Sequence, residues 1–373
     1  MSRRTLYRYV DASLASLRPT LHEIRFTNDA SRFSLLDQRG AVAIVIAVSL
    51  SALVSLAALV LDVGAALVSK HQLQNLVDAA ALAGSRQLGK LYESQPAAVS
   101  PSQPLSLANR ARVQAVVAEV ADKNRAATKL AGVTLADVRV GRWNAATRTV
   151  VSSPTGSDAV LVRAEGSMPT FLAGVVGIRR LSVSATAIAA LSAMAEVPPG
   201  ALTLPAGISS AWMALGPIDG RRLRLYAPGG GDPCAGWTTF TETPPTMGRL
   251  QTIVRGLAGS AYASPATVAG KTSFQFVAGN PVAIAPDIMA LYNAKKNPAT
   301  GQWTTVVPVY RQTQCAAPSS PLPVAGFATA VITAVTTPAG PALDAVVRSG
   351  FVQLGRGGGT DYGTEGSIPG LVQ

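Results

Sequence analysis

Histidine is nearly absent from this sequence: there are two, His22 and His71, and none follows His71. Catalysis by a serine or cysteine nucleophile needs a general base, which is usually a histidine. The residues after His71 therefore lack the base for a Ser/His or Cys/His site, and they contain no HExxH or GxSxG motif and no clear carboxylate pair. The sequence predicts a protein that is not an enzyme, with no catalytic residue, metal site or cofactor.

Cysteine is equally rare, with only Cys234 and Cys315 in the chain. No CxxC motif or Cys/His pair is present to bind a metal. In an oxidising compartment these two cysteines are expected to form a disulfide. The alternative of two separate buried thiols stays open at this point.

Charged residues make up 14% of the chain, yet the net charge is +12. A basic protein invites the hypothesis of a nucleic-acid partner, but the basic residues are scattered singly and form no cluster with interleaved aromatics. No nucleic-acid partner is expected. Because 48% of the residues are hydrophobic, the chain can form packed cores, and most of it is expected to be folded.

The stretch from Ala41 to Leu61 contains no charged residue and is almost entirely apolar. As a helix it would be about 30 Å long, which matches the hydrocarbon thickness of a bilayer. Two alternatives are a cleaved secretory signal, whose apolar region is shorter and is followed at once by its cleavage site, and a buried core helix, which is usually shorter and amphipathic. A membrane-spanning helix surrounded by lipid fits best.

Basic residues are concentrated on one side of this stretch. Before it lie Arg3, Arg4, Arg8, Arg18, Arg25, Arg32 and Arg39, whereas Lys70, Arg86 and Lys90 are the only ones in the region that follows, up to Leu91. The cytoplasmic side of a membrane helix carries the excess of Lys and Arg. We therefore expect a single-pass protein of the bacterial inner membrane, with its N-terminus in the cytoplasm and its later domains in the periplasm.

The helix is expected to continue beyond the membrane, because no proline occurs from Asp62 to Leu91 and apolar residues recur at helical spacing. These residues are Leu73, Leu76, Val77, Ala80, Leu88 and Leu91. Pro96, Pro101 and Pro104 would then end it. The small residues Ala79, Ala80, Ala83 and Gly84 would allow another helix to approach closely. Alternatively, this side of the helix packs on the chain's own domain.

The rest of the chain indicates an α+β fold. A helix is expected over Leu107–Leu130, a short helix over Met168–Ile178, and strands over Val138–Trp143, Arg148–Ser152, Val160–Glu165 and Leu181–Leu191. Pro198-Pro199-Gly200 marks a boundary, after which strand-like runs alternate with turns rich in glycine and proline. A β-rich C-terminal domain is expected there.

The helical region carries a specific combination of residues. Arg39-Gly40 precedes the apolar run, Asp62 and Gly64 end it, and Leu73-Gln74 and the block DAAALAG from Asp78 to Gly84 follow. This combination resembles the N-terminal region of TadG-like proteins, in the TadE/TadG group of the Flp (Tad, tight adherence) type IVb pilus assembly system. The segment from Met168 to Ile178 and the strand after it are similar to the same group. The resemblance implies partners among the other Flp/Tad pilus machinery proteins and allows a homo-oligomer.

The resemblance also implies which residues make the contacts. The expected helix-contact face consists of Asp62, Gly64, Gln74, Asp78, Ala80 and Gly84. Class III pilin precursors carry a glutamate at the fifth position after the glycine of their cleavage site, where this chain has Val45 after Gly40. A resident inner-membrane component is therefore favoured over a fibre subunit.

A long helix followed by a small antiparallel sheet is also the general plan of pilin-like subunits. The predicted division is 1–39, a cytoplasmic segment; 40–92, the transmembrane and juxtamembrane helix; 105–192, a pilin-like α+β domain; and 198–373, a β-rich periplasmic domain. The predicted function is a structural role in pilus assembly through protein–protein contacts. The alternative is a membrane-anchored adhesin or glycan-binding protein, in which Trp212, Trp237 and Trp303 would form an exposed face instead of packing in a core.

Overall fold

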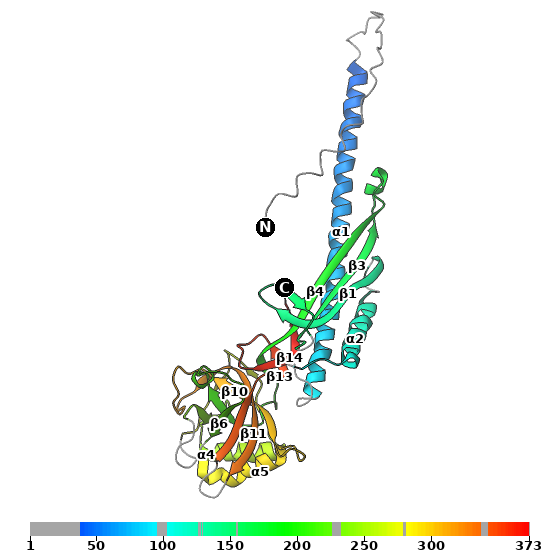
Figure 1. Ribbon diagram of the computed structural model, residues 1–373. Coiled ribbons are helices and arrows are strands. Elements are labelled where there is room, and N and C mark those ends of the chain that lie inside the picture. The colour runs from blue at the N-terminus through cyan, green and yellow to red at the C-terminus, as the bar shows by residue number, and fades with distance from the viewer. Residues whose placement is uncertain are drawn as a thin grey trace, which may run out of the picture. The chain divides into compact units, whose positions relative to one another are not determined.

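The computed structural model describes residues 38–94, 103–125, 128, 130–153, 156–225, 233–278, 281–336 and 342–372 (Figure 1). By its contacts the chain divides into two units, residues 1–57 and 58–373, which are described separately. The second unit contains both sheets and is α+β, as the sequence predicts. The expected cytoplasmic segment 1–39 lies outside the described residues except at its end, and Pro96 and Pro101 also lie outside them.

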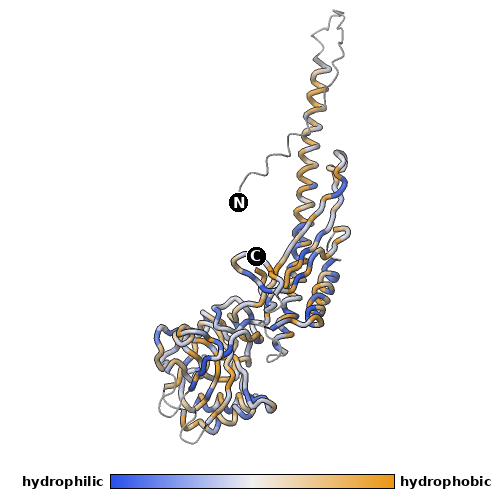
Figure 2. The backbone as a smooth tube through the Cα atoms, viewed as in Figure 1, coloured by the Kyte–Doolittle hydropathy of each residue, from blue (hydrophilic) through white to orange (hydrophobic). Residues whose placement is uncertain are grey.

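Helix α1, Gln38–Ser94, is 57 residues long and confirms the predicted helix. In the first unit, every side chain from Gly40 to Ala57 is exposed, and Figure 2 shows this stretch as predominantly hydrophobic. Ser51 and Ser55 each donate their hydroxyl to a carbonyl oxygen four residues earlier, at 2.7 Å. Because these hydroxyls are satisfied within the helix, they are compatible with a lipid environment. Among the described residues, α1 is the helix long and apolar enough to cross a membrane.

The second half of α1 is amphipathic and packs into the second unit. Its buried side chains follow the helical spacing that the sequence shows, at Leu73, Leu76, Val77, Ala80, Ala81 and Leu88. Helix α2, Leu107–Arg125, contributes Val113, Val117 and Ala121 to the same core. Figure 1 shows α2 and the strands of the first sheet beside this half of α1.

The first sheet has seven strands in the order β13-β14-β4-β3-β1-β2, with β8 paired to β4. Its strands are β1 Ala131–Asn144, β2 Thr149–Val151, β3 Ala159–Pro169, β4 Arg180–Val197, β8 Thr267–Val268, β13 Phe351–Gly357 and β14 Thr364–Leu371. Neighbouring strands are antiparallel, except that β13 and β14 are parallel. A 3₁₀ helix, η1 Ala173–Val176, connects β3 to β4.

The last two strands of the chain belong to this first sheet. β14 pairs with β4 through Glu365 opposite Ala193 and Gly366 opposite Ser192. The predicted domain 198–373 includes these residues, because a local sequence pattern does not indicate which strand a segment pairs with. The first sheet is therefore completed from the C-terminal end, while independent folding of residues 198–373 stays a prediction.

The second sheet also has seven strands, in the order β6-β12-β11-β10-β5-β7, with β9 paired to β11. Its strands are β5 Ala206–Ser209, β6 Arg221–Leu225, β7 Ala235–Trp237, β9 Ser273–Phe274, β10 Trp303–Tyr310, β11 Leu322–Thr336 and β12 Ala342–Arg348. Only β5 and β10 pair in parallel among these. Central strand β11 is buried at most of its positions, which indicates that both of its faces are covered.

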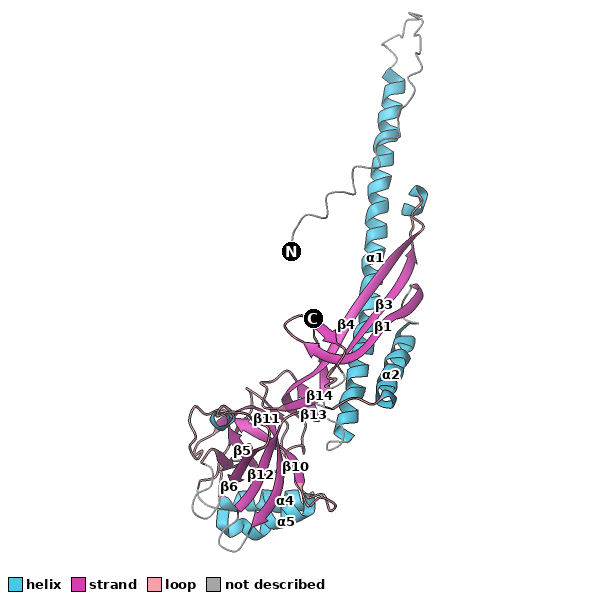
Figure 3. Cartoon of the chain, viewed as in Figure 1, coloured by secondary structure: helices cyan, strands magenta, loops and turns pink. Residues whose placement is uncertain are grey.

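The helical segments that accompany the second sheet, among the residues that the structure describes, are α3 Ser210–Met213, α4 Met247–Ala258, η2 Pro281–Ile284 and α5 Ala285–Lys295. Figure 3 shows α4 and α5 side by side, and Arg255 of α4 pairs with Asp287 of α5 at 2.8 Å. Thr246 caps α4 by accepting a hydrogen bond from the Arg249 amide at 3.3 Å. The domain is β-rich, as predicted, with these helices as an addition.

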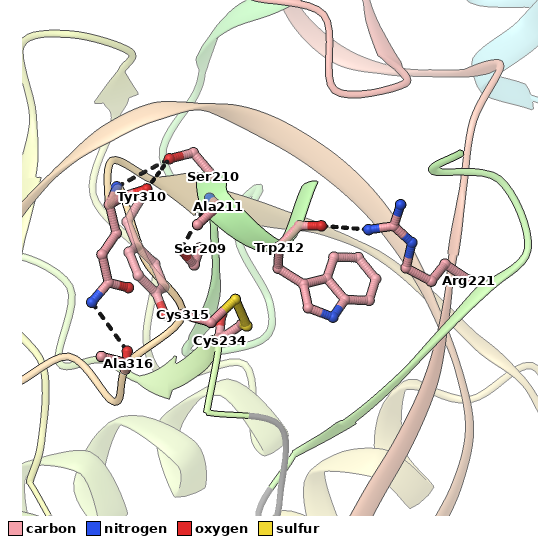
Figure 4. Close-up of a disulfide and its surroundings, with 10 residues drawn as sticks. Ser209, Ser210, Ala211, Trp212, Arg221, Cys234, Tyr310, Cys315 and Ala316 are labelled. Carbon is pink, nitrogen blue, oxygen red and sulfur yellow. Dashed lines mark hydrogen bonds between the residues drawn. A yellow bond between two sulfur atoms is a disulfide. The ribbon is translucent and has the colours of Figure 1, made fainter. Parts of the chain in front are cut away.

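A disulfide joins Cys234 to Cys315, whose Cα atoms are 4.4 Å apart (Figure 4). The carbonyl oxygen of Cys234 accepts hydrogen bonds from the Ser209 amide at 2.7 Å and from the Tyr310 hydroxyl at 3.0 Å. The bridge therefore fixes the chain before β7 to the loop that follows β10.

Candidate functional site

Asp62 lies on α1 directly after the apolar run, and its side chain is buried, with 4% of the residue exposed. One carboxylate oxygen accepts the amide of Phe171 at 2.6 Å, and the other accepts the amides of Leu172 at 3.2 Å and Ala173 at 2.7 Å. Ala173 is the first residue of η1 and Phe171 and Leu172 directly precede it, and the first N–H groups of a helix have no partner within it. Asp62 therefore caps a helix that begins 111 residues further along the chain.

The segment that Asp62 holds, residues 170–179, is named here the β3–β4 tip. Gly177 ends η1 with a positive φ of 90° and donates its amide to the Gly174 carbonyl at 3.1 Å. Ile178 donates to Ala173 at 3.0 Å, and the Thr170 hydroxyl donates to the Ile178 carbonyl. The tip is thus closed by its own hydrogen bonds and attached to α1 by Asp62.

Gln74 and Asp78 lie one turn apart on α1. The Gln74 side-chain amide donates to the Asp78 carboxylate at 2.8 Å and to the Thr186 carbonyl of β4 at 3.2 Å. Thr186 is opposite Arg163 on β3. These two predicted contact residues therefore connect α1 to the chain's own sheet.

Ala80 and Gly84 lie inside the chain's own core. Ala80 is fully buried, and a side chain at Gly84 would meet Val113 and Val117 of α2 and Val160 of β3. Other elements do pack closely against these small residues, as the sequence indicates, but those elements are α2 and β3 of the same chain. Another protein's helix has no access to these two residues in this fold.

Gly64 differs from the other five residues of the predicted face. It is exposed, and a side chain at this position would meet no atom of the described residues within 4 Å. Val68, His71 and Asn75 follow it on the same side of α1 and are also exposed. These four residues, named here the open α1 face, form one exposed side of the helix beyond Leu61, and Val63, Leu67 and Lys70 are exposed beside them.

A buried polar cluster lies where β14 meets α1, and sequence reasoning missed it. The hydroxyls of Ser85, Ser157 and Ser367 and one oxygen of Glu365 have no hydrogen-bond partner within the described residues. Burial, together with the neighbouring Asp158 and Asp361, raises the pKa of Glu365 to about 7 against the opposing effect of Arg142. Burial also raises the pKa of Asp158 to about 6, although this carboxylate accepts the Trp143 amide at 2.6 Å.

No local sequence pattern predicts this cluster, because its members come from α1, from the residues before β3, and from β14. Their proximity depends on the pairing of β14 with β4.

The tryptophans named for a glycan-binding face are in the core of the second unit: Trp212, Trp237 and Trp303 are exposed by 4%, 2% and 3%. They therefore form no exposed aromatic surface. A cleft of about 750 Å³ does open beside β10, β11 and β12, and polar side chains such as Lys295, Gln302 and Arg348 line it. Within the part of the chain that the structure describes, no group of three or more His, Cys, Asp or Glu could hold a metal ion.

Two family models match adjacent parts of the chain. Residues 40–89 match the family described as putative Flp pilus-assembly TadE/G-like, and residues 89–189 match the family described as putative Tad-like Flp pilus-assembly. The matched region contains α1, α2, β1 to β3 and most of β4. No curated protein and no solved structure matches the chain.

Proposed function

Because residues 40–189 belong to the TadE/G-like and Tad-like families of Flp pilus assembly, we propose that this Tad pilus component is a single-pass inner-membrane protein that acts through protein–protein contacts and not by catalysis. The assignment to Flp pilus assembly rests on the two family matches.

The exposed apolar surface of α1 is the observation that carries the proposal. The large side chains from Val42 to Leu61 are between 53% and 70% exposed. An apolar surface in water costs about 25 cal/mol per Å² relative to burial, and soluble proteins rarely expose a continuous patch of this kind. A bilayer supplies the missing apolar surroundings.

Two further observations support the orientation. The arginines precede the apolar stretch, as in helices whose N-terminus is cytoplasmic. The Cys234–Cys315 disulfide lies on the other side of that stretch, and disulfides persist in the periplasm but rarely in the cytoplasm. Both observations support a position of the second unit outside the inner membrane.

The open α1 face is the surface we assign to partners. Its first residue, Gly64, leaves room for a second helix to approach closely, as small residues do in helix pairs. Val68, His71 and Asn75 continue the same side into the periplasm. We assign this face to a helix of another component of the pilus machinery, with a second copy of this chain as the competing outcome.

Photo-crosslinking in cells that assemble the pilus tests this assignment. A photoreactive amino acid at Val68 or Asn75 should yield crosslinks to another pilus assembly protein. The matched control is Thr300, which is exposed within the predicted domain 198–373. Crosslinks only between copies of this chain, or no more at Val68 and Asn75 than at Thr300, would contradict the assigned surface.

Deletion of the gene separates assembly from the adhesin alternative. Loss of surface pili, restored by the full-length chain, is expected for an assembly component. Normal pili with reduced attachment would instead favour the adhesin. Cell fractionation with a C-terminal periplasmic reporter checks the single-pass topology in the same strains.

A further inference from the structure

The β3–β4 tip exposes large apolar side chains. Phe171 is 74% exposed and Ile178 is 50% exposed. They flank η1, whose hydrogen bonds and Asp62 cap hold the segment in a defined conformation. An ordered tip that presents apolar side chains to solvent indicates a contact surface.

The hydrogen bonds of Asp62 fix the position of this surface along α1. Asp62 is the first charged residue after the apolar run, and its neighbours Leu61 and Val63 are 58% and 47% exposed. A membrane-spanning helix meets the headgroup region where its apolar surface gives way to charge. The amide of Phe171 is 2.6 Å from the Asp62 carboxylate, so the tip lies at that level.

The charge of the tip is complementary to phospholipid. Arg179 and Arg180 directly follow Ile178 and are exposed, and the sequence from Met168 to Leu181 contains no acidic residue. Basic side chains next to apolar ones are typical of segments that lie in the membrane interface, where they meet anionic headgroups. Continuity with the apolar helix and this charge both favour lipid over a protein partner.

We propose that the β3–β4 tip is a second membrane contact, with Phe171 and Ile178 inserted in the periplasmic leaflet and Arg179 and Arg180 at the phosphates. This inference rests on the membrane anchoring proposed above. It adds that the folded domain is attached to the bilayer at two points, the helix and the tip. Two points restrict the tilt of the domain relative to the membrane, which one helix cannot do.

Site-specific fluorescence in vesicles tests the proposal. The full-length protein is reconstituted into phosphatidylethanolamine–phosphatidylglycerol vesicles, with one added cysteine at Phe171, Leu56 or Thr300 carrying an environment-sensitive dye. The expected result is a blue-shifted emission at Phe171 that spin-labelled lipid quenches. Leu56, within the apolar run, is the positive control, and Thr300 is the negative control.

The outcomes separate this inference from the anchor itself. A quenched dye at Leu56 with an unquenched dye at Phe171 would overturn the tip contact and leave the anchor intact, whereas unquenched dyes at both would overturn both. A blue shift at Phe171 without quenching would place the tip against a second copy of the chain and also contradict the proposal. Replacing both Arg179 and Arg180 by Gln should reduce the quenching at Phe171 but not at Leu56.

Discussion

Arg86 of α1 donates a hydrogen bond to the main-chain carbonyl of Ser367 at 3.0 Å, although 281 positions separate the two residues. The same guanidinium pairs with Glu93 at 2.9 Å. One turn beyond Arg86, Gly89 packs so closely against Ser367 that any side chain there would collide with its backbone. Strand β14 is thus fitted against the second half of α1.

Replacing Gly89 by Ala should destabilise the second unit by about 1–3 kcal/mol, because the added methyl group has no space against the Ser367 backbone. Gly64→Ala is the matched control on the same helix. It meets no neighbouring atom, and alanine favours a helix over glycine by up to about 1 kcal/mol. Thermal unfolding of the detergent-solubilised protein measures both variants, and equal shifts would show that β14 does not press on α1.

Stability should fall as the pH rises from about 4 to about 7. Glu365 and Asp158 titrate near 7 and 6 in the folded protein but near 4 in an unfolded chain. Within this window the folded state binds more protons than the unfolded state, so raising the pH reduces the free energy of unfolding. The groups that act on Glu365 are Asp158, Asp361 and Arg142.

Glu365→Gln tests this directly, since the amide keeps the size of the side chain without its charge. The variant should be more stable than the natural protein at pH 8, on the order of 1–3 kcal/mol, with a flatter dependence on pH. Chemical denaturation at pH 5 and pH 8 provides the measurement. A natural protein that is equally stable at both values would show that the carboxyl group of Glu365 is solvated.

Removal of the disulfide should destabilise the C-terminal domain. The bridge joins two residues that are 81 positions apart. A disulfide that closes a loop of this length stabilises the folded state by about 2–4 kcal/mol, because it restricts the conformations of the unfolded chain. The double variant Cys234→Ala, Cys315→Ala should therefore unfold at a lower temperature than the oxidised protein and no longer respond to reductant. Unchanged melting would show that the bridge adds no stability.

Asp62→Ala should release the β3–β4 tip from α1. The amides of Phe171, Leu172 and Ala173 lose their acceptor, so their hydrogen exchange should accelerate. Asp62→Asn should have a smaller effect, because one acceptor oxygen remains. Asp78→Ala is the control, since Asp78 makes no contact with the tip among the hydrogen bonds described for it. Equal exchange in all three variants would contradict the capping role.

The sequence predicted those elements whose signals are local. The absence of proline and the helical spacing of Leu73, Leu76 and Val77 identified the continuation of α1 and its buried side. Small residues correctly indicated close packing at Gly84, but spacing alone does not say whether the neighbour comes from the same chain. The structure shows Val113, Val117 and Val160 there.

Other features were missed for identifiable reasons. Helix α4 has Leu250, Ile253, Val254 and Leu257 at helical spacing. This is a local signal, but the prediction of a β-rich domain over 198–373 did not include the helix. The pairing of β14 with β4, the capping of η1 by Asp62 and the burial of Glu365 have no local signal. Each depends on residues more than a hundred positions apart that only the folded chain brings together.

The position of β14 has a consequence for biogenesis. β14 pairs with β4 at Ala189, Ala190, Ser192 and Ala193, so this edge of β4 stays uncovered until residues 364–371 have been synthesised. An uncovered strand edge can pair with another chain and so promotes aggregation. Folding of the first sheet is therefore coupled to the synthesis of a segment that follows the whole second sheet in the sequence.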